Sequence, residues 1–168
     1  MLNVHAVIDA VKTISAQPSW VEDSNGRLWI AVPLEIDSIT VESLFLRARV
    51  LKDAPDEDVF FQLEFDHDQN RRDKAISRID WRPLHSHDNK GCGPQEWRFQ
   101  AQKQSHFHKF DLNWLQMEGR LKASNLPIAV PLEIEPTDFQ GLLAFVGKNF
   151  RISNIEIISQ PGWEPVLL

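Results

Sequence analysis

The sequence predicts an α+β fold, a mostly antiparallel β-sheet with an N-terminal and a C-terminal helix packed on it. Two observations predict this arrangement. Several short segments alternate apolar and polar side chains, which is typical of half-buried strands. Segments near the two ends of the chain instead repeat apolar residues three and four positions apart, as amphipathic helices do. No low-complexity linker interrupts the 168 residues, so we expect a single domain spanning residues 1–168.

The first half of the chain predicts a helix followed by strands. Apolar side chains recur at helical spacing over residues 3–16, which indicates the N-terminal helix. Residues 27–36, RLWIAVPLEI, alternate in character and form the first expected strand, and Pro33 within it indicates a sheet edge. Further strands are expected at residues 39–51, with Arg47 and Arg49 facing outward, at 59–66 and at 75–81.

The second half predicts shorter strands and a closing helix. A loop is expected at residues 67–74 and a turn at 90–94, where KGCGP holds two glycines and a proline. Residues 135–149 begin with acids and continue with apolar side chains at helical spacing, which indicates the C-terminal helix. Strands are expected at 96–102, 106–114 and 150–158.

The heptapeptide IAVPLEI occurs twice, at residues 30–36 and 128–134. An internal duplication would explain the identity, but the sequences around the two copies diverge. We therefore favour two edge strands that meet the same requirement, an apolar inward face and a proline that blocks further strand pairing.

The net charge of −6 hides a segregation along the chain. Residues 1–70 hold 5 basic and 13 acidic side chains, whereas residues 71–109 hold 9 basic and 4 acidic ones. The basic segment would attract RNA, although the whole composition does not indicate a general nucleic-acid binder. The acidic N-terminal third, with Asp56, Glu57 and Asp58, instead favours a non-catalytic interaction or inhibitor module that binds a basic protein.

The apolar runs are too short to cross a bilayer, so no membrane association is expected. The N-terminal residues lack the basic flank and cleavage site of a signal peptide. The single cysteine, Cys92, is compatible with a reducing compartment, and we expect a cytoplasmic protein. The sequence does not indicate an oligomeric state.

Histidines concentrate in the basic segment and form two His-x-His pairs, His85/His87 and His106/His108. Residues two apart in a strand project from the same face, so each pair presents two imidazoles together. Four imidazoles on neighbouring strands would form a site for a transition metal such as Zn, Ni or Mn. Oxygen ligands would come from Asp88 or Asp111.

The same side chains also predict a metal-free site, because cleavage of RNA by its own 2′-hydroxyl needs a base, an acid and a cation at the phosphate. His87 or His85 would act with His106 or His108, while Arg78, Arg82 or Arg98 neutralises the phosphate. Substrate contacts are expected from Arg82, Arg98, Trp97 and Asn89, and base stacking from Trp81, Trp97 and Phe107. The prediction is a ribonuclease-like or metal-assisted hydrolase. In the alternative structural interpretation, the histidines only hydrogen-bond within their loop.

In the segments RIDWRPLHSHDNKG, SHFHKFDLNW, LPIAVPL and FQGLLAFV the chain resembles a group of uncharacterised bacterial proteins from accessory gene neighbourhoods, some of toxin–antitoxin or phage-defence character. That group shares an Arg-x-Asp strand, a His-x-Asn element, a later His-x-His strand and a Phe-rich helix. The matching positions, within residues 60–150, are Arg78, Asp80, His87, Asn89, His106 and His108. The resemblance implies a toxin-like accessory protein without a defined activity, and the acidic first third has no counterpart in it.

Overall fold

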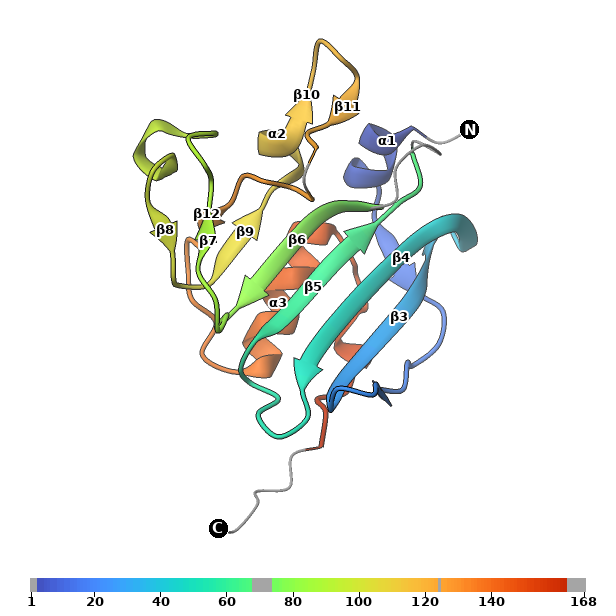
Figure 1. Ribbon diagram of the computed structural model, residues 1–168. Coiled ribbons are helices and arrows are strands. Elements are labelled where there is room, and N and C mark those ends of the chain that lie inside the picture. Colours follow the sequence, from blue (N-terminus) through green and yellow to red (C-terminus); the bar gives the residue numbers. More distant parts are fainter. Residues whose placement is uncertain (1–2, 68–73, 124, 163–168) are drawn as a thin grey trace, which may run out of the picture.

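The computed structural model describes residues 3–67, 74–123 and 125–162. An eight-stranded antiparallel sheet forms its centre (Figure 1), with the strand order β1-β3-β4-β5-β6-β9-β12 and with β2 beside β3. The long helix α3 (Phe139–Phe150) packs on one face, and the short helix α1 (Val4–Asp9) lies near one end of the sheet. The predicted α+β class, with a helix near each end of the chain, is confirmed.

The strands of the main sheet are β1 (Lys12–Ile14), β2 (Val21–Glu22), β3 (Arg27–Ile36), β4 (Ile39–Leu51), β5 (Val59–Glu64), β6 (Ala75–Trp81), β9 (His106–His108) and β12 (Val130–Pro131). Two further strand pairs lie outside it, β7 (His87–Asp88) with β8 (Ala101–Gln102) and β10 (Trp114–Leu115) with β11 (Arg120–Leu121). The remaining helical turns are η1 (Gln95–Trp97), α2 (Phe110–Asn113) and η2 (Ile155–Ile157).

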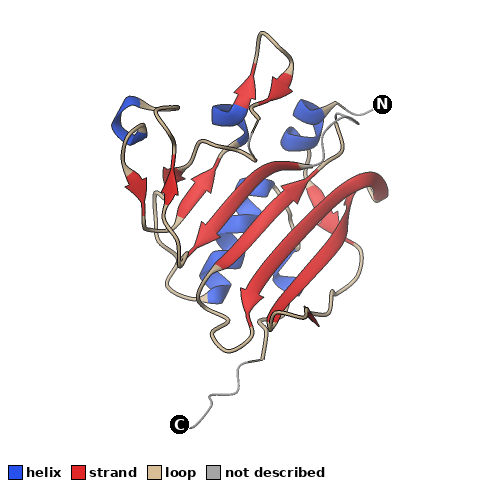
Figure 2. Ribbon diagram, in the orientation of Figure 1, coloured by secondary structure: helices blue, strands red, loops and turns tan. Residues whose placement is uncertain are grey.

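The register of the sheet sends alternate side chains to opposite faces. One row across five successive strands is buried, and it consists of Ile30, Ala48, Phe61, Ile79 and Phe107. This row faces α3, since the rings of Phe61 and Phe139 lie 6.3 Å apart and those of Phe107 and Phe150 lie 6.2 Å apart. Burial of one such large side chain contributes about 1.5–3 kcal/mol. Among the described residues, no helix covers the opposite face of β3 to β6 (Figure 2).

The two IAVPLEI copies lie near opposite edges of the sheet. The first is in β3, where β2 pairs with residues up to Trp29 and β1 pairs from Leu34 onward, so Pro33 falls between the two short partners. The second copy supplies only β12, the last strand at the other edge. The edge prediction is confirmed for Pro131 in β12, whereas β3 is an inner strand and Pro33 lies only at the gap between β2 and β1. The expected alternation fails in the second copy, where Ile134 is 76% exposed.

The chain ends differ from the predicted elements. The N-terminal helix ends at Asp9, and the chain then joins the sheet as β1. Lys12 explains this change, because its buried ammonium donates hydrogen bonds to the carbonyls of Ala10 at 2.8 Å and Phe150 at 3.0 Å. The predicted last strand is the turn η2 with a single bridge from Ile152 to Lys12.

Two other segments that were predicted as strands are each divided into two elements. The strand expected at 106–114 divides into β9 and α2, and that at 96–102 divides into η1 and β8. Residues 68–73, which make up most of the expected loop, lie outside the described residues. In the part of the chain that is described, no helix has the length and apolar character needed to span a bilayer.

Candidate functional site

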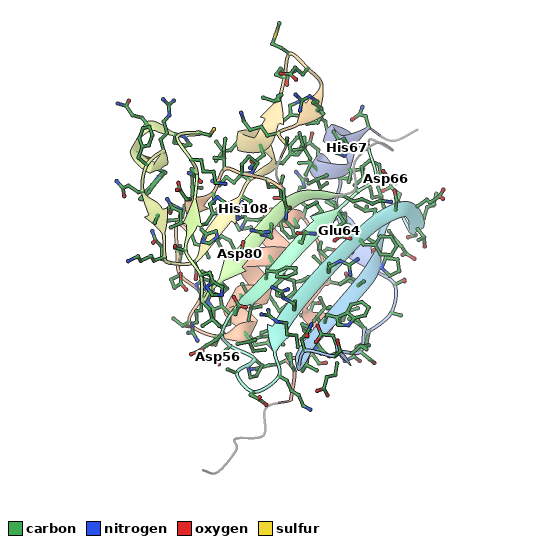
Figure 3. The ribbon with its side chains drawn as sticks, viewed as in Figure 1. Asp56, Glu64, Asp66, His67, Asp80 and His108 are labelled. Carbon is green, nitrogen blue, oxygen red and sulfur yellow. The ribbon has the colours of Figure 1, made fainter. Side chains whose placement is uncertain are left out.

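Two strands that are distant in sequence place four polar side chains on the uncovered face of the sheet. β6 pairs with β9 so that Arg78 lies opposite His108 and Asp80 lies opposite His106. Because residues two apart in a strand share a face, all four side chains project the same way. Figure 3 shows Asp80 and His108 on this face, on the same side as Glu64. We call Asp80, His106 and His108 the histidine–aspartate cluster.

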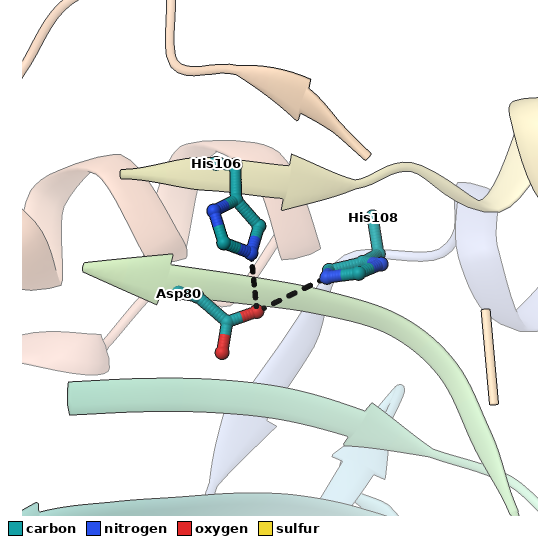
Figure 4. Close-up of side chains that lie close together, drawn as sticks. All are labelled: Asp80, His106 and His108. Atoms are coloured by element: carbon teal, nitrogen blue, oxygen red, sulfur yellow. Dashed lines mark ion pairs between the residues drawn. The ribbon is translucent and has the colours of Figure 1, made fainter. Parts of the chain in front are cut away.

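Both imidazoles of the cluster direct Nε2 at one oxygen of Asp80 (Figure 4). Nε2 of His108 is 3.2 Å from Oδ2 of Asp80, and Nε2 of His106 is 3.5 Å from it. Neighbouring ligand atoms around a tetrahedral Zn²⁺ ion lie roughly 3.3 Å apart, given bonds of about 2.0–2.1 Å. The spacing therefore fits a metal ion, and these three residues could hold one.

Backbone carbonyls determine which imidazole nitrogen carries a proton. Nδ1 of His108 is 2.6 Å from the carbonyl oxygen of Leu126, and Nδ1 of His106 is 2.9 Å from that of Gln104. A carbonyl oxygen only accepts, so each Nδ1 donates and each neutral ring keeps its lone pair on Nε2. Histidines that bind metals are oriented by a second hydrogen bond of this kind. The lone pairs of both neutral rings therefore point toward the Asp80 carboxylate.

Burial controls the protonation of the cluster. His106 and His108 are 3% and 0% exposed, and this burial lowers the pKa of both rings, that of His108 to about 4. Burial opposes ionisation of Asp80 as well, but two effects outweigh it and lower the pKa of the carboxyl to about 2: the hydrogen bond from His108, whose ring is protonated at the low pH where Asp80 titrates, and the charge of Arg78. At neutral pH the cluster is therefore two neutral imidazoles and a carboxylate, three electron-pair donors that attract a cation.

Arg78 supplies one cation at the entrance to the cluster. Its Nε donates to Oδ2 of Asp80 at 2.8 Å, and its Nη2 lies 3.0 Å from Nε2 of His108. The side chains of Arg78 and Asp80 keep exposed fractions of 21% and 17%, whereas the two imidazoles are covered. The cluster is therefore reached from the uncovered face of the sheet, and an anionic group that enters there meets the guanidinium of Arg78.

His87 brings a third imidazole to the cluster. Its ring centroid is 4.6 Å from that of His108 and 5.6 Å from that of His106. Nε2 of His87 lies 2.8 Å from the carbonyl oxygen of Pro127, so this nitrogen donates and Nδ1 is left as the acceptor of the neutral ring. Three histidines from β7 and β9 are thus in ring contact.

The predicted site residues divide into two groups. His87, His106, His108 and Arg78 lie together at the cluster. His85, predicted as a metal ligand, is exposed, and the structure does not bring it into ring contact with the other three histidines.

The residues predicted as substrate contacts do not belong to the cluster. Arg82 pairs with Asp56 at 3.0 Å, and Arg98 donates to the carbonyl of Gly93 at 2.6 Å. Trp97 is half-buried in η1. Asn89 is fully buried and holds backbone groups, so its side chain is not open to a substrate.

The expected stacking rings are also placed differently. Trp81 and Phe107 are 0% and 7% exposed, and both belong to the side of the sheet that packs on α3. The indole of Trp81 donates to the carbonyl of Pro136 at 3.0 Å. Neither ring can stack on a base. Cys92 is exposed and takes no part in the cluster.

Asp80 is the member of the cluster that the sequence did not predict as a ligand. Asp88 and Asp111, named instead, are exposed and lie outside the cluster, and Asp88 accepts the N–H of Lys90 in a turn at 2.7 Å. The signal for Asp80 was the Arg-x-Asp alternation that it shares with Arg78. That signal becomes informative only when β6 is known to pair with β9.

Ion pairs within the molecule neutralise part of the negative charge in the first third of the chain. Asp58 pairs with Arg27 at 3.2 Å, and Asp56 pairs with Arg82. These ion pairs reduce the charge that the loop offers to a basic protein. The interaction-module hypothesis remains a prediction.

No family model, curated protein or solved structure matches this chain. The resemblance to accessory bacterial proteins therefore also remains a prediction.

Proposed function

We propose that the protein is a metal-assisted hydrolase of phosphodiesters in which Asp80, His106 and His108 hold a divalent transition-metal ion such as Zn²⁺. One observation carries the proposal. Both imidazoles are oriented by backbone carbonyls at Nδ1, and both direct Nε2 at the same carboxylate oxygen. Imidazole nitrogens and a carboxylate oxygen are the ligands of many catalytic zinc sites, which keep a further position open.

The neighbouring side chains fit defined roles in such a reaction. Arg78 has the planar donor geometry that suits a phosphate group, and it lies at the exposed side of the cluster. His87 has Nδ1 available to receive or deliver a proton. A bound metal ion would supply Lewis acidity toward a phosphoryl oxygen. In the overall reaction the oxygen of water forms a bond to phosphorus, a P–O ester bond breaks and the leaving oxygen takes a proton, so no further reactant is needed.

The metal content of the purified, tag-free protein tests this proposal. We expect near-stoichiometric zinc, or another transition metal, by elemental mass spectrometry, and hydrolysis of bis(p-nitrophenyl) phosphate that EDTA abolishes. The double variant His106→Asn/His108→Asn should lose both metal and activity while remaining folded. His85→Asn is the matched control, because His85 is exposed and outside the cluster. A folded protein that stays metal-free after incubation with zinc would overturn the proposal.

A second candidate is metal-free cleavage of RNA by acid–base catalysis. It is favoured by Arg78, which already donates to Asp80 and lies within hydrogen-bond distance of Nε2 of His108, so a cation is present without any metal. His87 and His106, 5.6 Å apart at their centroids, would then serve as acid and base. RNA cleavage that persists in EDTA, together with inactivity toward DNA, identifies this mechanism.

A further inference from the structure

The cluster lies at one end of a broad sheet surface that carries arginines and aromatic rings. The register assigns the outward side chains of β3 to β6 to this surface. It is the face of the sheet opposite α3 (Figures 1 and 2), and we call it the open face. Its central members are Trp29, Arg47, Arg49, Phe60 and Arg78. All five are partly exposed, in contrast to the fully buried row that faces α3.

Arg49 differs from its two arginine neighbours on this face. Arg47 is held by Glu64 through two bonds of 2.8 and 3.2 Å, and Arg78 is held by Asp80. Arg49 forms no ion pair with any described residue, and its Nε is buried without a hydrogen-bond partner. Burial of an unpaired guanidinium is costly. The ring of Phe60 lies against it, and the carboxylates of Asp58, Asp80 and Asp23 attract it without forming an ion pair. Arg49 is therefore the cation of the open face that lacks an anion.

The guanidinium of Arg49 lies over an aromatic ring. Its Cζ is 4.7 Å from the ring centroid of Phe60, and Cζ of Arg47 is 5.9 Å from that of Trp29. Unpaired bases are recognised on proteins by stacking on aromatic rings and on arginine planes, with cations beside them for the phosphates. The open face offers both kinds of group side by side.

The strand register places the Arg49–Phe60 pair in line with the histidine–aspartate cluster. Arg49 lies opposite Phe60, Phe60 lies opposite Asp80, and Asp80 lies opposite His106, so the four form one row across four strands. Adjacent strands are about 4.8 Å apart, which separates Arg49 from Asp80 by roughly 10 Å. A short segment of a bound strand can span that distance and contact both.

We propose that the open face binds single-stranded nucleic acid, with a phosphate on Arg49 and a base stacked on the Arg49–Phe60 pair, so that an adjoining phosphodiester reaches Asp80 and the histidines. The inference rests on the proposed function, because it names the substrate class of the same site. Charge complementarity selects this occupant, since an unpaired arginine beside a ring matches a phosphate beside a base. A duplex is disfavoured, because its bases are already stacked on one another and a face four strands wide is broader than the helix or two-stranded ribbon that a groove admits.

Fluorescence anisotropy with a labelled 2′-O-methyl oligouridine of about 12 nucleotides, in EDTA, tests the inference without cleavage by either mechanism. We expect wild-type protein to bind and Arg49→Gln and Phe60→Leu each to weaken binding about tenfold. Binding should fall as salt rises, with a smaller slope for Arg49→Gln. The matched control is Arg120→Gln, which removes an exposed arginine of β11 that pairs with Glu118 and should bind like wild type.

Three results would overturn the inference: no binding by wild-type protein, unchanged binding by both folded open-face variants, or equal binding of a duplex of the same length. The double variant His106→Asn/His108→Asn separates this inference from the proposed function. It should lack metal and hydrolysis but still bind the oligonucleotide more tightly than Arg49→Gln does, because Arg49 and Phe60 are intact. If the wild-type protein binds the oligonucleotide but has neither metal nor hydrolysis, the nucleic-acid face is supported and the hydrolase is rejected. If it has metal and hydrolysis but does not bind the oligonucleotide, the hydrolase is supported and the nucleic-acid face is rejected.

Discussion

The side chains of Asn89 and Asn113 hold two adjacent residues of one segment through paired hydrogen bonds. Asn89 accepts from the N–H of Ala129 and donates to its carbonyl, both at 2.9 Å, and Asn113 does the same to Ile128, also at 2.9 Å. In an extended chain, adjacent residues point their backbone groups to opposite sides. The two asparagines thus take the place of neighbouring strands, which explains why the second IAVPLEI copy contributes so short a strand to the sheet.

Asn89→Ala should destabilise the fold. The substitution leaves the buried N–H and carbonyl of Ala129 without partners, so we expect a loss of about 2–4 kcal/mol in the free energy of unfolding. Urea denaturation measures it, with the exposed Asn25→Ala as control. If Asn89 were instead a substrate contact, as the sequence suggested, stability would stay unchanged and only substrate binding would weaken.

Asp80→Asn should reduce metal affinity. The amide keeps the shape of the side chain but removes the negative charge at the oxygen to which both Nε2 atoms point. We expect the apparent dissociation constant for zinc to rise by more than about tenfold, measured by competition with a chromogenic chelator. Asp111→Asn removes an exposed carboxylate outside the cluster and should bind zinc normally. Equal zinc affinity in Asp80→Asn and wild type would contradict the assignment.

Acidification should destabilise the metal-free protein through His108. Its folded pKa of about 4 lies below the ordinary value of 6.5, so between these pH values the unfolded chain binds a proton that the folded chain does not. Stability therefore falls as pH drops from 6.5 to 4, by up to about 3 kcal/mol from this residue. His108→Asn keeps a donor for the Leu126 carbonyl and should show a smaller loss between pH 7 and 4.5.

Denaturation curves of the EDTA-treated protein at several pH values check this prediction. His85→Asn, an exposed histidine variant, should lose as much stability on acidification as wild type. A loss of the same size in His108→Asn would show that another group causes the acid sensitivity.

Lys12→Met should loosen the junction of α1 and α3. The ammonium of Lys12 donates to carbonyls at the C-terminal ends of both helices, those of Ala10 and Phe150, and methionine cannot replace these bonds. We expect a loss of about 1–3 kcal/mol in the free energy of unfolding at pH 7. The exposed Lys103→Met serves as the control in thermal and urea unfolding. A variant as stable as wild type would show that burial of the charge cancels the benefit of its bonds.

Local patterns predicted the main elements, and they gave the observed limits of β3, β4 and β6 but not those of the elements near the chain ends. The strands at β3, β5 and β6 and the helix α3 follow from periods of two and of about 3.6 residues, which depend on near neighbours only. The N-terminal helix was predicted too long, because the break after Asp9 depends on contacts of Lys12 with Phe150 far along the chain.

The residue patterns of this chain determined its α+β class and identified the two histidine pairs and Arg78 as the chemically distinctive groups. The tertiary structure alone decided which of them meet. Pairing of β6 with β9 set Asp80 against His106 and His108, excluded His85 from the group and turned Trp81 and Phe107 into the core. The physical reason is that alternation records which side chains share a face of one strand, whereas the partner strand and its register depend on contacts between distant segments.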